Sequence, residues 1–196
     1  MKKLTIILDA AHGAETPGKR SPDGRFREYK WSRDIISKLK SKLQSLDFEV
    51  FESNSTEREI GLSQRVQNTN KIKRKNKIFI SIHSDAAGNG IDWMSARGYS
   101  VYTTPGQNNS DKFAEILLTN FQKDFPELKG RFDNSDGDKD KEANFQVIKG
   151  VNCPAVLIEW CFQDNKEDVE ILLNDEYNKK FIDSIVESIE KWNEVL

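Results

Sequence analysis

The chain has 196 residues, enough for one domain with a substantial core. Its 30 lysines and arginines nearly balance 32 aspartates and glutamates, and the resulting formal charge of −2 argues against a general nucleic-acid-binding surface. No apolar stretch approaches the roughly 20 residues that a membrane span requires, so we expect a soluble globular protein without a membrane span.

The first predicted element is a buried strand at Leu4 to Leu8, which is followed by Asp9, two alanines and His12. An apolar run of this kind is typical of a parallel strand that is covered on both faces. Two lysines before it resemble the start of a signal peptide. The apolar run is shorter than the roughly 7–15 residues of such a peptide, however, and Asp9 interrupts it. We therefore expect a first strand and no export signal.

Strands and helices are then predicted to alternate along the chain. Helical spacing of apolar residues predicts helices at about 28–46, 62–75, 110–125, 166–173 and 176–192, with Ser110 as the N-cap of the third. Apolar or alternating runs predict further strands at 48–51, 78–83, 98–103, 145–148 and 155–162. This order predicts an α/β fold with a single, mostly parallel sheet and helices on both faces. No repeat or linker divides the chain, so one domain is expected.

The segment from Lys129 to Glu142 is the most loop-like part of the chain. Its aspartates resemble those of a calcium-binding loop. Aligning Gly137 with the invariant glycine of an EF-hand loop, however, places Phe132 at the first ligand position. A solvated loop is therefore the favoured interpretation. The two cysteines, Cys153 and Cys161, are too few to indicate a disulfide framework.

Both histidines of the chain, His12 and His83, follow predicted strands. Ligand sites of open α/β sheets lie just beyond the carboxyl ends of strands. Glu28 at the start of a predicted helix adds a carboxylate. Two imidazoles and a carboxylate form one of the three-ligand sets of catalytic zinc. Taken alone, each residue also has an ordinary structural explanation, in which the histidines end strands and Glu28 begins a helix. Taken together, the three residues indicate a metal site.

Glu159 is a single carboxylate within an otherwise apolar predicted strand. An unpaired carboxylate is costly to bury, so it requires either a basic partner or a function. Beside a metal ion it would serve as a proton acceptor. Cys161, two residues further along the strand, is expected on the same face, and a buried free thiol is a more common state for it than a ligand.

The remaining candidates have weaker signals. Asp9 and Asp85 each lie within three residues of a proposed ligand and are predicted to orient an imidazole, with an ordinary strand-end aspartate as an equally weighted alternative. The aromatic residues considered for stacking on a substrate, at spacings that are also typical of a core, are Trp93, Tyr102, Phe26 and Trp160. Arg58 and Arg65 are expected on the surface or in ion pairs.

Several motifs occur in an order that resembles a known family. They are ILDAAHG (7–13), Glu28 opening the first helix, LSQRVQNTN (62–70), ISIHSD (80–85), GYSVY (98–102) and FQVIKGVNCPAVLIEWCFQDN (145–165). With this set, the sequence resembles the zinc-dependent N-acetylmuramoyl-L-alanine amidases of the Amidase_3 family. The resemblance implies that His12, Glu28 and His83 bind Zn²⁺, that Glu159 is the catalytic carboxylate, and that the twisted sheet has about six strands.

The sequence also departs from the family pattern. Ala11 replaces a usual glycine, Asp85 a usual asparagine, and Trp160-Cys161 a usual small residue and glycine. These changes spare the proposed ligands and the proposed base. We therefore expect them to affect how closely a substrate approaches, and so its selection, more than activity.

The activity that the resemblance implies is hydrolysis of the amide between the lactyl group of N-acetylmuramic acid and L-alanine in peptidoglycan. Two alternatives remain open: a zinc peptidase that cuts within the stem peptide, and a non-catalytic wall-binding protein with structural zinc. Residues 1–196 are expected to form one catalytic domain without a separate wall-binding module. The expected partner is peptidoglycan. Without an export signal, the chain fits a phage lysin released by a holin, or a secreted amidase whose leader has been trimmed; an activating partner is not indicated.

Overall fold

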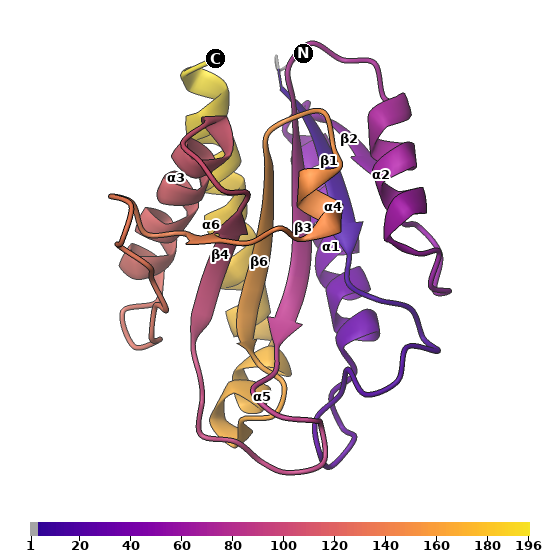
Figure 1. The fold of residues 1–196 in the computed structure, drawn as a ribbon, viewed down its shortest axis with the longest axis vertical. Helices are drawn as coiled ribbons and strands as arrows, with labels where there is room; N and C mark the ends of the chain where they lie inside the picture. Colours follow the sequence, from indigo (N-terminus) through magenta and orange to yellow (C-terminus); the bar gives the residue numbers. More distant parts are fainter. Residues whose placement is uncertain (1–3) are drawn as a thin grey trace.

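The computed structural model describes residues 4–196, which fold around a six-stranded sheet (Figure 1). The strands are β1 (Thr5–Ala10), β2 (Glu49–Glu52), β3 (Lys77–Asp85), β4 (Tyr99–Thr103), β5 (Lys141–Glu142) and β6 (Ala155–Phe162). Their order across the sheet is β2-β1-β3-β6-β4-β5. β4 runs antiparallel to β6, and the other four described strand pairs are parallel. The prediction of a mostly parallel sheet of about six strands is confirmed.

Helices cover both faces of this sheet. They are α1 (Glu28–Ser45), α2 (Leu62–Lys71), α3 (Asn109–Asp124), α4 (Gln146–Lys149), α5 (Lys166–Leu172) and α6 (Asp175–Glu194). In Figure 1, α4 lies in front of the sheet and α6 behind it, and α1 and α3 both pack against α6. On the opposite face α2 packs against α4. No helix within the described residues is sufficiently long and apolar to cross the bilayer.

The larger hydrophobic core lies between the sheet and the α1–α3–α6 layer. At its centre the fully buried ring of Trp160 stacks on Phe181, with ring centroids 4.2 Å apart, and contacts Phe125 at 4.8 Å. Truncating a buried aromatic residue of this size costs about 3–5 kcal/mol. Phe26 is also fully buried in this core. Trp160 and Phe26 are therefore core residues, and their alternative role in stacking on a substrate is wrong.

A smaller core on the opposite face leads directly to the candidate site. Ile7, Phe79 and Leu157 form it with residues of α4. Because alternate residues of a strand share a face, Glu159 lies on the same face as Leu157, two positions further along β6. In the sheet register Glu159 pairs with His83 of β3. The smaller core thus ends where these two polar side chains begin.

Four local predictions need correction. Residues 145–148, predicted as a strand, are mostly part of the short helix α4, because a four-residue segment is too short to distinguish a buried strand from a helical turn. The second helix ends at Lys71 rather than at about residue 75. The N-cap of α3 is Asn108, whose side chain accepts a hydrogen bond from Ser110 N at 2.7 Å. Within 129–142, the last two residues form β5.

Candidate metal centre and active site

The site begins where the chain leaves β1. His12 has φ 47°, a left-handed conformation that a non-glycine residue keeps only when its surroundings impose it. Two guanidinium groups hold this turn. Arg33 donates to the carbonyls of Ala11 (3.0 Å) and His12 (2.7 Å), and Arg65 donates to the carbonyl of Ala10. Three successive backbone carbonyls are therefore fixed by side chains from α1 and α2.

Arg65 is buried, and two carboxylates balance its charge. It lies 3.3 Å from both oxygens of Asp9 and 3.0 Å from Glu59. Asp9 also accepts hydrogen bonds from Ser81, at 2.7 Å, and from Ser53. None of these partners is an imidazole, so the prediction that Asp9 orients an imidazole directly is corrected. Asp9 instead positions the guanidinium that holds the turn before His12.

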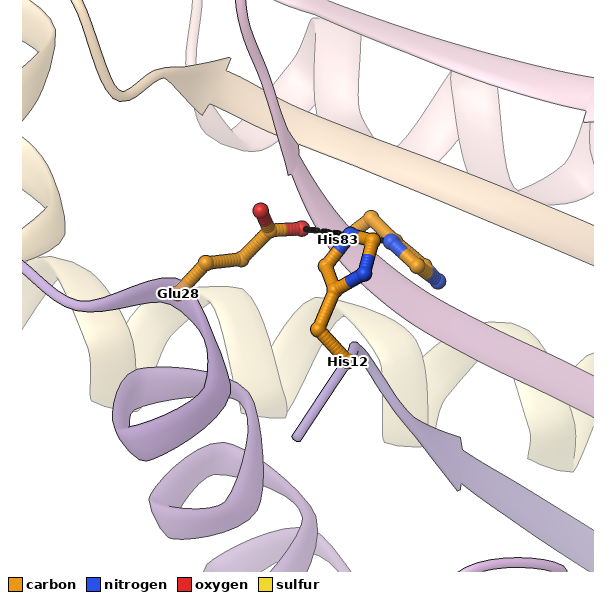
Figure 2. Close-up of side chains that lie close together, drawn as sticks. All are labelled: His12, Glu28 and His83. Carbon is orange, nitrogen blue, oxygen red and sulfur yellow. Dashed lines mark hydrogen bonds and ion pairs between the residues drawn. The ribbon is translucent and has the colours of Figure 1, made fainter. Parts of the chain in front are cut away.

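The three predicted metal ligands come together from three separate segments (Figure 2). Glu28 is the first residue of α1, and its Oε1 lies 3.2 Å from Nδ1 of His83 and 3.5 Å from Nε2 of His12. The two imidazole rings are 5.1 Å apart between centroids and nearly perpendicular. One potential ligand atom from each residue lies within 4.8 Å of the other two. The group is therefore able to hold a metal ion.

Glu28 is held by two further donors. The backbone N–H of Ser84 donates to Oε1 at 3.2 Å, and the side-chain amide of Gln163 donates to Oε2 at 3.1 Å. Gln163 is buried, and its amide also donates to the Ser84 carbonyl. These contacts turn Oε1 toward the two imidazoles. Nothing in the sequence pattern singles out Gln163, because a glutamine after a strand has no distinctive spacing.

The protonation states of His12 and Glu28 are those that binding of a metal cation requires. Burial lowers the pKa of His12 to about 4 despite the opposing charge of Glu28, so the imidazole is neutral at pH 7. Burial by itself would raise the pKa of Glu28. Its hydrogen bond to His83 and its electrostatic interactions with His83 and His12 outweigh burial, so the pKa of Glu28 is lowered overall. Metal ligands must be deprotonated in this way. In addition, Nε2 of His12 is buried without a hydrogen-bond partner, a state that buried polar atoms rarely keep.

Glu159 stands on the strand next to His83. Burial raises the pKa of Glu159 well above its usual value, and the charges of Glu28 and Asp85 raise it further. Its Oε2 is buried and has no hydrogen-bond partner. No lysine or arginine among residues 4–196 forms an ion pair with Glu159. The alternative that Glu159 is buried with a basic partner is therefore wrong. A carboxylate in these surroundings readily accepts a proton.

Cys161 does not share the face of Glu159, contrary to the prediction from alternation. Its φ of 59° breaks the strand pattern, and the β3–β6 register shifts between His83 and Asp85. The side chain consequently packs in the larger core, next to Trp160 in sequence. Burial raises the pKa of this thiol well above its usual value. Cys161 is thus a buried free cysteine rather than a metal ligand.

Asp85 also lacks the predicted bond to an imidazole. Its Oδ1 accepts a hydrogen bond from Ala86 N at 2.8 Å, and no imidazole within the described part of the chain donates to it. Burial raises the pKa of Asp85, and Lys141 and Arg131 oppose that rise. Asp85 therefore contributes negative charge near Glu159 rather than orienting a ligand.

The two aromatic residues predicted to contact a substrate have different surroundings. Tyr102 lies on β4, two positions from Ser100, which pairs with Glu159. It is half-buried, and burial together with the charges of Asp85 and Glu159 raises its pKa. Trp93 is half-buried against the larger core, with the Lys166 ammonium 5.8 Å from its ring centroid. Tyr102 thus lies on the face that bears the site. A substrate contact for either residue remains a prediction.

Known proteins resemble this chain over nearly its whole length. A family model described as N-acetylmuramoyl-L-alanine amidase, Amidase_3, matches residues 6–191. The N-acetylmuramoyl-L-alanine amidase AmiC of Neisseria meningitidis serogroup B is 24% identical over 223 residues, which span 97% of this chain and 53% of AmiC. The chain therefore spans about half the length of that relative.

Two solved structures have the same fold. The N-acetylmuramoyl-L-alanine amidase from Clostridium difficile 630 superimposes with a TM-score of 0.84 at 23% identity, covering 98% of this chain and 97% of that one. The catalytic domain of CwlV from Bacillus (Paenibacillus) polymyxa var. colistinus gives a TM-score of 0.82 at 24% identity, covering 99% of both chains.

Proposed function

Because the chain belongs to the Amidase_3 family of N-acetylmuramoyl-L-alanine amidases, we propose that it is a zinc-dependent peptidoglycan hydrolase. The bond it cleaves is the amide between the lactyl group of N-acetylmuramic acid and the L-alanine of the stem peptide. The observation that carries this proposal is the convergence of His12, Glu28 and His83 beside the unpaired carboxylate of Glu159. Peptidoglycan is then its partner, and the cell wall is where it acts.

The three ligand residues fit zinc in kind and in spacing. Tetrahedral Zn²⁺ with ligand bonds of about 2.0–2.1 Å separates its ligand atoms by about 3.3 Å. Oε1 of Glu28 lies 3.2 and 3.5 Å from the nearest imidazole nitrogens, which agrees with that separation. The unpartnered Nε2 of His12 would gain a partner. Histidine, histidine and glutamate would leave a fourth position open, as catalytic zinc requires.

The metal ion and the residues around it would have separate roles in the reaction. Bound zinc would polarise the scissile carbonyl and acidify water. Glu159 accepts the proton of the attacking water and returns a proton to the departing α-amine of L-alanine. Burial favours proton uptake by raising the pKa of Glu159. Ser84 N and the Gln163 amide hold the Glu28 carboxylate in place throughout.

Metal analysis combined with mass spectrometry of digested peptidoglycan tests this function. We expect about one zinc per chain and the release of intact stem peptides that begin with L-alanine. Fragments cut within the stem would instead support a zinc peptidase. A zinc-containing protein that releases no product would support a wall-binding role. His83→Ala provides the matched control, because it should lose both zinc and product release.

A further inference from the structure

Two basic side chains, Arg131 and Lys141, flank the candidate site on its β4 and β5 side. Lys141 belongs to β5 and pairs with Tyr102 of β4, and its ammonium lies 5.6 Å from the centroid of the Tyr102 ring. The backbone N–H of Arg131 donates to the carbonyl of Tyr99 at 2.8 Å, which ties this residue to the same strand. Its guanidinium lies 5.1 Å from the centroid of the Phe162 ring at the end of β6.

Unlike several other cations among residues 4–196, these two have no carboxylate as an ion-pair partner. Arg97, for example, is paired with Asp168 at 3.2 Å. Within residues 4–196, no acidic group forms an ion pair with Arg131 or Lys141, and Nε of Arg131 is buried without a hydrogen-bond partner. Burial and the neighbouring charge of Arg131 lower the pKa of Lys141, and the charges of Asp85, Asp133 and Glu159 oppose that decrease. Gly130, next to Arg131, bridges to Tyr99, and Lys141 pairs with Tyr102 on the same edge of β4, so the two like charges lie near each other.

The same cations lie beside the catalytic region. Tyr102, which pairs with Lys141, pairs on its other side with Leu157 of β6, two positions before Glu159. β5 lies two strands from β6, or about 10 Å at a strand spacing of about 4.8 Å. Flexible lysine and arginine side chains span much of that distance. A group bound between them would lie close to the scissile amide without occupying the metal centre.

We propose that Arg131 and Lys141 bind the free α-carboxylate of the stem-peptide residue that follows L-alanine. This inference rests on the proposed amidase function. The carboxylates of peptidoglycan are on its stem peptides, whereas a glycan strand with amidated lactyl groups is neutral. The α-carboxyl group of the second residue lies within about two residue lengths, or ~7 Å, of the scissile amide. The guanidinium of Arg131 is able to donate two parallel hydrogen bonds to a carboxylate, and the ammonium of Lys141 adds a compact positive charge.

Recognition of this carboxylate would make the enzyme selective among stem peptides. Converting the carboxylate to a carboxamide removes the negative charge but keeps the shape. The two cations would then remain desolvated beside a neutral group. A site built around one polar partner discriminates strongly against an analogue that lacks it.

A matched pair of synthetic substrates tests the inference. Both are N-acetylmuramoyl-L-alanyl-D-glutamate with the γ-carboxyl capped as a methylamide, and they differ only in a free α-carboxylate or an α-carboxamide. With zinc-loaded protein we expect kcat/KM to be at least about tenfold higher for the carboxylate, mainly through KM. Arg131→Gln and Lys141→Gln should each bring this ratio toward one. Lys123→Gln removes the same charge from an exposed lysine paired with Glu187, and it should leave the ratio unchanged.

Calorimetry on the metal-free protein in chelator gives a second readout that needs no turnover. The wild type should bind the carboxylate compound more tightly than the carboxamide, and a variant that combines Arg131→Gln with Lys141→Gln should bind both equally. Equal kcat/KM for the two substrates, or an unchanged ratio in both variants, overturns the inference and leaves the amidase function standing. Failure to cleave either substrate contradicts the amidase function instead, and the calorimetric preference then still decides the inference.

Discussion

Glu159 is the residue whose surroundings are hardest to explain by stability alone. A carboxylate within an apolar strand, with a buried oxygen that has no hydrogen-bond partner, costs free energy to keep. We predict that Glu159→Gln lowers kcat on peptidoglycan by about 100- to 10,000-fold, because an amide cannot accept the proton. Zinc content should stay at the wild-type level, since none of the three ligands changes. Rate measurements and metal analysis on the same sample check this, and retained turnover would remove Glu159 from the mechanism.

A second buried carboxylate lies away from the site and concerns stability. Oγ1 of Thr103 is 2.6 Å from Asp140 and 2.8 Å from Asp111, yet a hydroxyl has only one proton to donate. Burial raises the pKa of Asp140 to about 7, and the charges of Asp138 and Asp111 add to the rise. The folded state therefore binds more protons than the unfolded state between about pH 4 and 7, so this residue makes the fold less stable as pH rises through that range.

Asp140→Asn removes this titration. We predict that the variant is little changed in stability relative to the wild type near pH 4 and becomes progressively more stable than the wild type up to pH 8. Urea unfolding of both proteins at several pH values measures the difference. A difference in unfolding free energy that does not vary with pH would contradict the assigned cause.

At the scale of single residues, the sequence was informative where chemistry is distinctive. Two histidines at strand ends and one carboxylate in an apolar strand stand out without a structure, and His12, Glu28 and His83 do lie together. Gln163 does not stand out, because its hydrogen bonds go to Glu28 and Ser84, which are 135 and 79 positions away. The position of Asp9 suggests a role near the ligands, but its partner Arg65 comes from α2, and only the packing of that helix sets the pair.

At the scale of elements, the turn after β1 depends on helices α1 and α2. Arg65 is buried with Asp9, and removing one partner of a buried pair leaves an uncompensated charge. We predict that Arg65→Met lowers the free energy of unfolding by about 3–5 kcal/mol. Adding Asp9→Asn should restore part of that loss, because the neutral amide no longer needs the guanidinium. Arg58→Met, at an exposed arginine, should change stability by less than about 0.5 kcal/mol. Urea denaturation of the four proteins checks this, and equal losses at 58 and 65 would contradict it.

Long, periodic elements could be predicted from the sequence, and short or irregular ones could not. The apolar stripe of α1 contains enough residues to show its helical period, and the long, nearly continuous apolar run of β6 is typical of a buried strand. The four residues of α4 do not, and only their packing against the smaller core decides between helix and strand. The turn of Cys161 into the larger core depends on a positive φ that no spacing rule reveals.

At the scale of the whole molecule, the metal site lies beyond the hydrophobic cores, at the ends of three segments that the larger core already packs together. His12 follows β1, Glu28 begins α1, and His83 lies in β3, so a bound ion would link three segments at one end of the sheet. The two cores are complete without it. The fold should therefore persist in chelator but unfold at a lower temperature, since a ligand that binds only the folded state stabilises it by about 4 kcal/mol at 1,000 times its Kd.

Thermal unfolding with and without zinc tests whether the ion stabilises the fold, and a variant of Gln163 tests whether it does so at the Glu28 site. We predict that zinc raises the wild-type Tm, that His83→Ala abolishes the rise, and that Gln163→Leu reduces it. The leucine leaves Oε2 of Glu28 buried without its donor, and losing such support for a ligand typically weakens metal binding by about 10- to 100-fold. Gln64→Leu, at an exposed glutamine bonded to Asn68, should keep the full rise. A zinc-dependent Tm that survives in His83→Ala would place the ion elsewhere in the molecule.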